Sequence, residues 1–215
     1  MIVPIFLLDS GEKWLPVPIE TILTVNAKID GQPLTSLDQL TSTTKRIDFP
    51  ANMTQPKGTT PTVYHRAVPA ANLVWHQFWT WWLYNPKEYL GFGMHEGDWE
   101  MVQIGCADEQ GDKPVLMTYS QHTSGQKHEY WYGVQFEAGR PKVYVAFGSH
   151  ANYYSVHHDE VDDADGAGVR IDPQVDEFGA WATWNGQWGN SDNSPGSLPS
   201  HLSWRAPHQF HSQAH

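Results

Sequence analysis

The stretch from Leu73 to Tyr84 is apolar along most of its length and contains four tryptophans. An extended chain of this kind carries apolar side chains on both faces, which favours a central strand covered on both sides. A buried helix is the alternative, because Trp75, Phe78, Trp79 and Trp82 also fit helical spacing. Both interpretations place this segment in the interior.

Aromatic residues are abundant throughout the chain, with 11 Trp, 9 Tyr and 8 Phe, while only 17% of residues are charged. This composition favours strands. Glycine and proline recur often, as in β-sandwiches and barrels. We expect a mostly β protein, an antiparallel β-sandwich with long loops and few short helices, forming a single domain over residues 1–215. Besides the central segment, strands are expected at 3–8, 62–68, 98–106, 115–120, 130–136 and 142–147, a short helix at 18–23, and a surface excursion at 31–61.

The charge balance excludes one class of partner. The 215 residues include 13 basic and 24 acidic side chains, so a phosphate-backbone (nucleic-acid) binder is not expected. Cys106 is the single cysteine and lies in an apolar strand, where a core role is favoured over a nucleophile. No run reaches transmembrane length. A cytoplasmic location is favoured, with a mature secreted form as the alternative; the sequence leaves the oligomeric state open.

The segment His95-Glu96-Gly97-Asp98-Trp99-Glu100 is the strongest functional signal. Acids this dense beside an apolar run are costly unless a cation neutralises them. On a strand Asp98 and Glu100 point to one face, with Cα atoms roughly 6.6 Å apart, and can converge on one hard metal ion. His95 has the wrong parity to join them, but a bulge or turn at Gly97 could bring it to the same side. The alternative is a solvated strand start with a structural Trp99.

Two further histidines follow expected strands. His122 comes after 115–120 and His150 after 142–147. If these strands are neighbours, both imidazoles could gather with His95 at one rim of the sheet, where sites usually lie. Imidazole can ligate a metal or carry protons near neutral pH, although each histidine could instead cap its strand. Tyr119 and Tyr153 are expected to assist there.

Two other segments have an ordinary interpretation and a functional alternative. The acidic stretch 157–166 is favoured as a solvated loop, with a lid over the rim as the alternative. The Gly-Gln-Trp-Gly run at 186–189 is favoured as a turn pinned by packed indoles, with a stacking platform for sugars as the alternative.

The same motifs, taken in order, resemble the vacuolar protein sorting-associated protein 62 family. The resemblance rests on the 95–100 motif, Gln121-His122, the segment 145–153, and the segment 184–189 with Ser194-Pro195-Gly196. It spans most of the chain, and it implies little about chemistry because that family is largely uncharacterised.

The pattern His95-x-x-Asp98-Trp99-Glu100 is also similar to the His-x-His-Asp-Trp-Glu motif of necrosis- and ethylene-inducing-like proteins. Those proteins are β-sandwich cytolysins that hold a divalent metal and bind sphingolipid head groups. The resemblance implies that His95, Asp98 and Glu100 are metal ligands. Gly97 stands where that motif has its second histidine.

We therefore predict a metal-dependent enzyme, a hydrolase or lyase acting on a small-molecule or glycan substrate. In this prediction His95, Asp98 and Glu100 hold the metal, and His122, His150, Tyr119 and Tyr153 assist catalysis. Oxygen ligands favour Mg²⁺, Ca²⁺ or Mn²⁺, while added histidines make Zn²⁺ or Fe²⁺ possible. The alternative is a metal-assisted protein that binds a glycan or a lipid head group.

Overall fold

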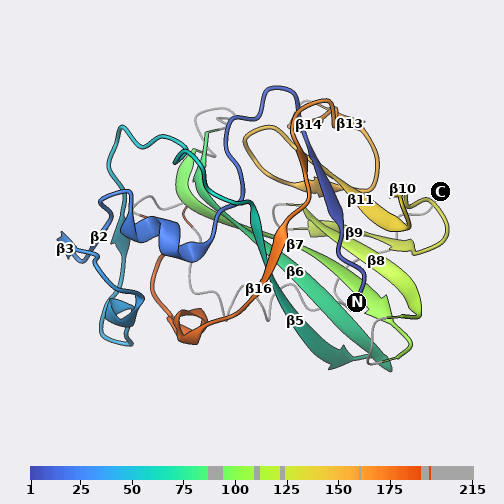
Figure 1. Cartoon of the computed structure of the whole chain (residues 1–215), viewed down its shortest axis with the longest axis horizontal. Coiled ribbons are helices and arrows are strands. Elements are labelled where there is room, and N and C mark those ends of the chain that lie inside the picture. The colour runs from blue at the N-terminus through green and yellow to red at the C-terminus, as the bar shows by residue number, and fades with distance from the viewer. Residues whose placement is uncertain (87–93, 109–111, 122–123, 160, 190–193, 195–215) are drawn as a thin grey trace.

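The computed structural model describes residues 1–86, 94–108, 112–121, 124–159, 161–189 and 194 (Figure 1). The longer strands are β5 (Thr62–Ala70), β6 (Leu73–Asn85), β7 (His95–Cys106), β8 (Pro114–Gln121), β9 (Ser124–Glu129) and β11 (Arg140–Val145). The shorter strands are β1 (Ile5–Leu8), β2 (Lys28–Ile29), β3 (Gln32–Pro33), β4 (Ile47–Asp48), β10 (Phe136–Glu137), β12 (Asn152–Tyr153), β13 (His157–His158), β14 (Asp163–Ala164), β15 (Arg170–Ile171) and β16 (Gln174–Glu177). Three 3₁₀ turns complete the described part: η1 (Ile19–Leu23), η2 (Leu37–Gln39) and η3 (Ala180–Thr183).

Two sheets form the sandwich. The larger sheet has the order β16-β5-β6-β7-β8-β9 and is antiparallel except for the β16–β5 pair. The smaller sheet has the order β10-β11-β1-β15, with β12 on β11, and its β1–β11 pair is parallel. Figure 1 shows β5 to β9 as one broad twisted layer beside the smaller sheet. The predicted mostly β sandwich is confirmed.

Apolar side chains from both sheets form the core between them. Phe6, Val143 and Val145 of the smaller sheet cluster with Phe78 and Val102 of the larger one, and all five are buried. Burial of such side chains contributes roughly 1.5–3 kcal/mol each relative to exposure. This core fixes how the two sheets face each other. It therefore sets the position of the rim, the end of the sandwich where β7, β8 and the loop containing His150 meet.

A second core covers the outer face of the large sheet. Trp79, Trp81 and Trp99 point to this face and pack with Trp181 and Trp188 from the segment after β16. Residues of the segment 31–61 join the same cluster: Leu34, Leu40, Ile47 and Phe49. The central strand β6 is therefore covered on both faces, as predicted. The segment 31–61 is not a free surface excursion, because its apolar side chains cover these indoles.

Two local predictions need correction. The strand expected at 130–136 is a turn at Tyr130–Gly133 that follows β9, and Gly133 has a φ of +85°. The aromatic β-preference of this stretch does not decide the outcome, because propensity is weaker than tertiary context. The short helix predicted at 18–23 is the 3₁₀ turn η1. None of the described helical turns is long and apolar enough to cross a membrane.

Candidate functional site

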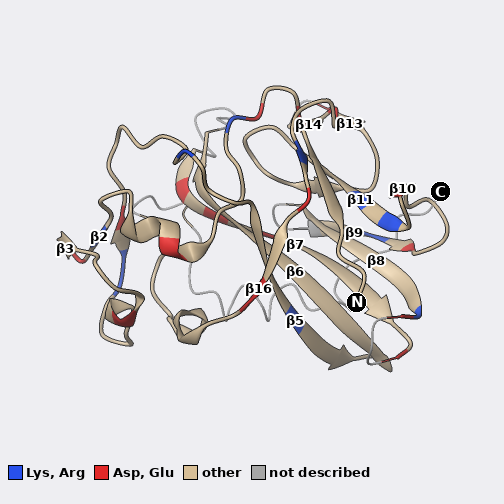
Figure 2. Ribbon diagram, viewed as in Figure 1, with Lys and Arg blue, Asp and Glu red and all other residues tan. Residues whose placement is uncertain are grey.

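The acidic motif lies at the start of β7, where Figure 2 marks acidic positions on the ribbon. Asp98 lies opposite Trp82 of β6, and Glu100 lies opposite Thr80. Trp99 points to the other face and is wholly buried in the outer core. The predicted alternation is therefore correct, with the two carboxylates on one face and the indole on the other. Asp98 is 7% exposed and Glu100 is 3% exposed.

Gly97 departs from strand dihedral angles, but the pairing of β7 with β6 continues past it in one register, so the bulge that the sequence suggested is not formed. Its φ is +66°, and a Cβ at this position would lie 1.9 Å from the carbonyl oxygen of Trp188. A side chain could be added only if the Trp188 backbone moved. The ring of His95 does not turn toward the carboxylates. Its Nδ1 lies 2.7 Å from the carbonyl oxygen of Gly97, and its Nε2 lies 3.2 Å from Nδ2 of Asn85.

His150 occupies the interior of the rim. It lies in the loop between β11 and β12, has a φ of +53°, and its side chain is wholly buried. Its Nδ1 is 2.9 Å from Oδ2 of Asp98, and its ring stacks on Trp82 with centroids 4.0 Å apart and planes 4° apart. A rare backbone conformation at a buried polar residue requires support from the surrounding structure.

Glu12 faces the other side of the same imidazole. Its Oε2 lies 3.6 Å from Nε2 of His150 and accepts a hydrogen bond from the backbone N–H of Gly148 at 2.7 Å. Its Oε1 accepts the backbone N–H groups of Lys13 and Trp14 at 2.8 and 2.7 Å. Three backbone N–H groups thus hold the Glu12 carboxylate in place. The imidazole therefore lies between two carboxylates, with Glu12 on one side and Asp98 on the other.

Glu100 belongs to a neighbouring network on β8 and β12. The hydroxyl of Ser120 donates a short hydrogen bond to Oε2 of Glu100 and accepts the backbone N–H of Met101 at 2.9 Å. Nδ2 of Asn152 donates to the same hydroxyl at 3.4 Å, and Nε2 of Gln121 donates to the carbonyl oxygen of Asn152 at 3.1 Å. Strands β7, β8 and β12 thus meet around one buried carboxylate.

A further buried acid holds the His150 loop. Asp162 is 1% exposed and accepts hydrogen bonds from the hydroxyls of Ser149 at 2.5 Å and Tyr153 at 2.7 Å. The stretch 157–166, expected as a solvated loop, therefore enters the interior at Asp162, which anchors the His150 loop. His158 and Asp163, which pair on the surface, fit the solvated interpretation.

The residues predicted to assist catalysis do not all join the rim. The hydroxyl of Tyr119 donates to the sulfur of Met117 within the core, and that of Tyr153 donates to Asp162. Burial raises the pKa of both phenols, so neither is suited to carry protons near neutral pH. His122 lies outside the described residues.

The side chains of the rim match the predicted metal centre only in part. Asp98 and Glu100 share a face and offer carboxylate oxygens, which hard cations prefer. Among the described residues, however, no three His, Cys, Asp or Glu side chains are placed to hold one ion, and His95 faces Asn85. The described geometry fits a carboxylate pair and does not fit the predicted three-ligand centre.

Sequence reasoning missed the partners of these predicted residues, above all Glu12, Ser120, Asn152 and Asp162. Asn152 follows two residues after His150, so the run Ser-His-Ala-Asn after a strand could have indicated it. Glu12 stands alone in a loop, 136 residues before Gly148, and no spacing rule connects the two.

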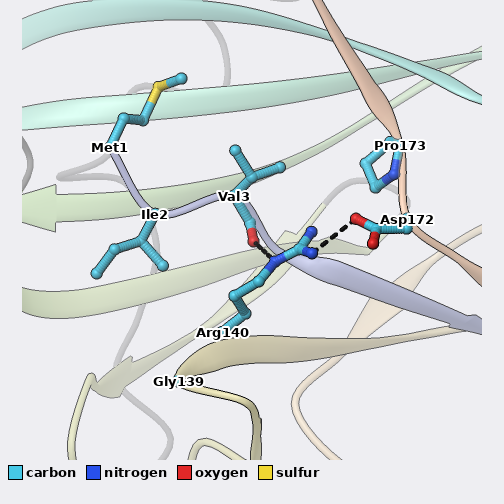
Figure 3. Close-up of a pocket in the computed structure, with 7 residues that line it drawn as sticks. All are labelled: Met1, Ile2, Val3, Gly139, Arg140, Asp172 and Pro173. Atoms are coloured by element: carbon cyan, nitrogen blue, oxygen red, sulfur yellow. Dashed lines mark hydrogen bonds and ion pairs between the residues drawn. The ribbon is translucent and has the colours of Figure 1, made fainter.

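One pocket of about 370 Å³ lies away from this rim, at the edge of the smaller sheet (Figure 3). Figure 3 shows the guanidinium of Arg140 between Val3 and Asp172. Its Nε donates to the carbonyl oxygen of Val3 at 2.8 Å, and its Nη1 donates to Asp172 at 2.6 Å. Nη2 donates to the carbonyl oxygen of Pro4 at 3.2 Å. This arginine ties the start of the chain to the sheet, which is a structural role.

Comparisons with known proteins show the fold. No family model matches the sequence, and no curated protein matches it. Among solved structures, necrosis and ethylene inducing protein 2 from the causal agent of cocoa's witches' broom disease gives a TM-score of 0.54 at 13% identity, covering 94% of this chain and 87% of that chain. The resemblance to necrosis- and ethylene-inducing-like proteins is thereby confirmed for the fold.

Two more solved structures are similar to this chain at lower TM-scores. One is described as "Toxin fold for microbial attack and plant defense", with a TM-score of 0.48, 13% identity and coverage of 80% of this chain and 69% of that chain. The other is described as "NLPPya in complex with mannosamine", with a TM-score of 0.48, 13% identity and coverage of 81% and 69%. At these scores neither adds to the assignment of the fold.

Proposed function

We propose that this protein binds a glycan, free or displayed as a lipid head group, at the rim where β7, β8 and the His150 loop meet. The observation that carries the proposal is the buried series Glu12–His150–Asp98, which fixes the carboxylates of this rim in advance of any ligand. Binding sites use such fixed polar groups because little conformational freedom is then lost on association.

The same geometry favours binding over catalysis. A general acid or base must come within hydrogen-bond reach of the proton that it transfers. The His150 side chain is wholly buried, and each ring nitrogen faces a carboxylate. The phenols of Tyr119 and Tyr153 are tied to Met117 and Asp162. The hydrolase or lyase prediction therefore gains no support from the described residues, and the binding alternative becomes the main proposal.

A divalent cation remains part of the proposal. Asp98 and Glu100 would hold it through carboxylate oxygens, so Mg²⁺, Ca²⁺ or Mn²⁺ is expected before Zn²⁺ or Fe²⁺. When bound, the cation would neutralise the paired acids and offer open positions to sugar hydroxyls. Asp98 has the more exposed carboxylate, with 11% of its side chain accessible, and is therefore the side chain closest to an approaching ligand.

The proposal is tested with phosphatidylcholine vesicles that carry or lack glucosylceramide, and with an array of soluble glycans. Wild-type protein should bind a sugar-bearing target, and Asp98→Asn should weaken binding about tenfold, equivalent to 1.4 kcal/mol. Asp112→Asn is the matched control, because that carboxylate is 72% exposed and precedes β8, at the opposite end of this strand from Ser120. Equal binding by wild type and Asp98→Asn, or no binding to any sugar-bearing target, would overturn the proposal.

A further inference from the structure

The turn after β9 exposes two large aromatic side chains. Trp131 is 71% exposed and Tyr132 is 69% exposed, whereas Trp181, Trp184 and Trp188 are buried. The sequence left open whether the segment 186–189 is a turn pinned by packed indoles or a stacking platform for sugars. Because these indoles are buried, the segment is not a surface platform. The exposed aromatic surface lies instead in a segment that the sequence placed in a strand.

Neighbouring side chains hold the Trp131 indole in place from beneath. Its ring stacks on Phe136, with centroids 5.5 Å apart and planes 21° apart, and meets Tyr130 edge-on at 4.8 Å. Tyr130 is wholly buried, and its backbone N–H donates to the carbonyl oxygen of Val115 at 2.9 Å. The turn is closed by the backbone N–H of Tyr132, which donates to the carbonyl oxygen of Glu129 at 3.0 Å. One face of a fixed indole is thus presented to solvent.

We propose that Trp131 is a second sugar contact, on which a pyranose ring of a neutral, β-linked glycan stacks. Pyranoses with equatorial hydroxyls present a face of C–H groups that matches an aromatic ring, while their edges form hydrogen bonds. A rigid indole supplies this contact area at low entropic cost. The inference rests on the proposed glycan-binding function and places a contact outside the rim.

Charge decides between a sugar and a membrane surface. Exposed Trp and Tyr also occur at membrane interfaces. Here, however, Glu129 is exposed in the same turn, and the chain carries a net charge of −11. Negative charge opposes approach to anionic lipid surfaces, whereas a carboxylate accepts hydrogen bonds from sugar hydroxyls. The exposed turn is therefore assigned to a glycan.

The exposed Trp131 indole, called the platform below, is distinct from the rim. Tyr130 pairs with Val115 at the start of β8, while Ser120 and Gln121 lie at the other end of that strand. Six strand residues separate the two ends by roughly 20 Å. A glycan chain of several sugars, or two separate chains, would be needed to reach both places.

The experiment titrates cellohexaose into wild-type protein and follows the indole N–H signals by nuclear magnetic resonance, with affinity from calorimetry. The Trp131 signal, identified by its loss in Trp131→Phe, should shift on titration. Trp131→Ala should weaken binding about tenfold, as expected for a lost stacking contact of roughly 1.4 kcal/mol, and Trp131→Phe should restore part of it. Val169→Ala, a change at a 49% exposed apolar residue elsewhere, should bind as wild type. Unchanged melting temperatures would show that the variants are folded.

The outcomes separate this inference from the proposed function. If Asp98→Asn abolishes cellohexaose binding and Trp131→Ala does not, the rim binds the sugar and the platform is overturned. If Trp131→Ala weakens binding and Asp98→Asn does not, the platform stands even if the rim proposal fails. Absence of cellohexaose binding, with Trp131-dependent binding to plain phosphatidylcholine vesicles, would overturn the sugar assignment in favour of a membrane anchor.

Discussion

At the scale of single residues, the interior of the rim depends on His150, because one imidazole contacts Glu12, Asp98 and the ring of Trp82. Truncating this side chain leaves two carboxylates buried without their shared partner. Truncating a large buried side chain typically costs about 3–5 kcal/mol, because it leaves a cavity and removes the contacts of its buried polar neighbours. His150 therefore contributes much of the stability of the rim. The sequence suggested this residue only as an acid/base group or a further ligand.

We predict that His150→Ala lowers the free energy of unfolding by about 3–5 kcal/mol, as measured by urea denaturation. His158→Ala is the control, because His158 pairs with Asp163 on the surface and should cost no more than about 1 kcal/mol. Equal, small losses in both variants would mean that the buried pairing does not stabilise the fold.

The stability of the fold should also depend on pH through a pair of buried histidines. His65 and His76 lie side by side on β5 and β6, with Nε2 and Nδ1 3.1 Å apart. Burial, followed by the neighbouring histidine, lowers the pKa of His65 from 6.5 to about 4, and burial also lowers that of His76. Between pH 6.5 and pH 4 the unfolded chain therefore binds protons that the folded chain does not. The contribution of these histidines to the free energy of unfolding is complete above pH 6.5 and is lost as the pH falls toward 4.

The melting temperature should thus fall between pH 6.5 and pH 4, and the fall should be shallower in the double variant His65→Gln, His76→Gln. Comparing variant and wild type across the same range removes the contribution of carboxylates common to both. Parallel curves would show that the pair titrates in the folded state as it does in the unfolded state.

At the scale of elements, β7 joins the two cores, and Gly97 is where the loop containing Trp188 comes close to it. We predict that Gly97→Ala lowers the free energy of unfolding by more than about 1–3 kcal/mol, since strain at positive φ and a backbone clash add. Gly139→Ala is the control, because its φ is also positive, at +79°, and nothing lies within 4 Å of an added Cβ. A similar loss in both variants would assign the effect to backbone strain alone.

The same elements show what the sequence can predict. Alternation along 98–106 correctly separates the acids from Trp99, because strand parity is local. The apolar run at 73–84 correctly predicts a strand covered on both sides, because consecutive residues of one segment supply the apolar side chains of both faces. The contact between Glu12 and His150 could not be predicted, since it depends on how the loop at residue 12 meets the loop at residue 148. The strand expected at 130–136 fails because Gly133 and the β8–β9 hairpin, rather than aromatic content, determine where the chain turns.

At the scale of the whole molecule, strands β5, β6 and β7 of the large sheet are covered on both sides, by the small sheet on one face and by segments near both ends of the described chain on the other. The rim carboxylates are therefore held by β7, β8, the residue 12 loop and the His150 loop together. A ligand bound there should stabilise the entire fold and not one hairpin, because unfolding any of these elements removes part of its site.

A cation bound to Asp98 and Glu100 should likewise stabilise the entire fold. Mg²⁺, Ca²⁺ or Mn²⁺ added to chelator-treated protein at about one hundred times its dissociation constant should stabilise the fold by about 2.7 kcal/mol, or roughly 5–10 °C in melting temperature for a chain of this size. The double variant Asp98→Asn, Glu100→Gln should lose this response, because its amides no longer carry the charge that attracts a hard cation. His95→Ala should keep it, since that ring is directed at Asn85 and Gly97. A response lost in His95→Ala would restore the three-ligand centre predicted from sequence. A wild-type melting curve unchanged by all three cations would remove the cation from the rim and leave the His150 imidazole as the shared contact of Glu12 and Asp98.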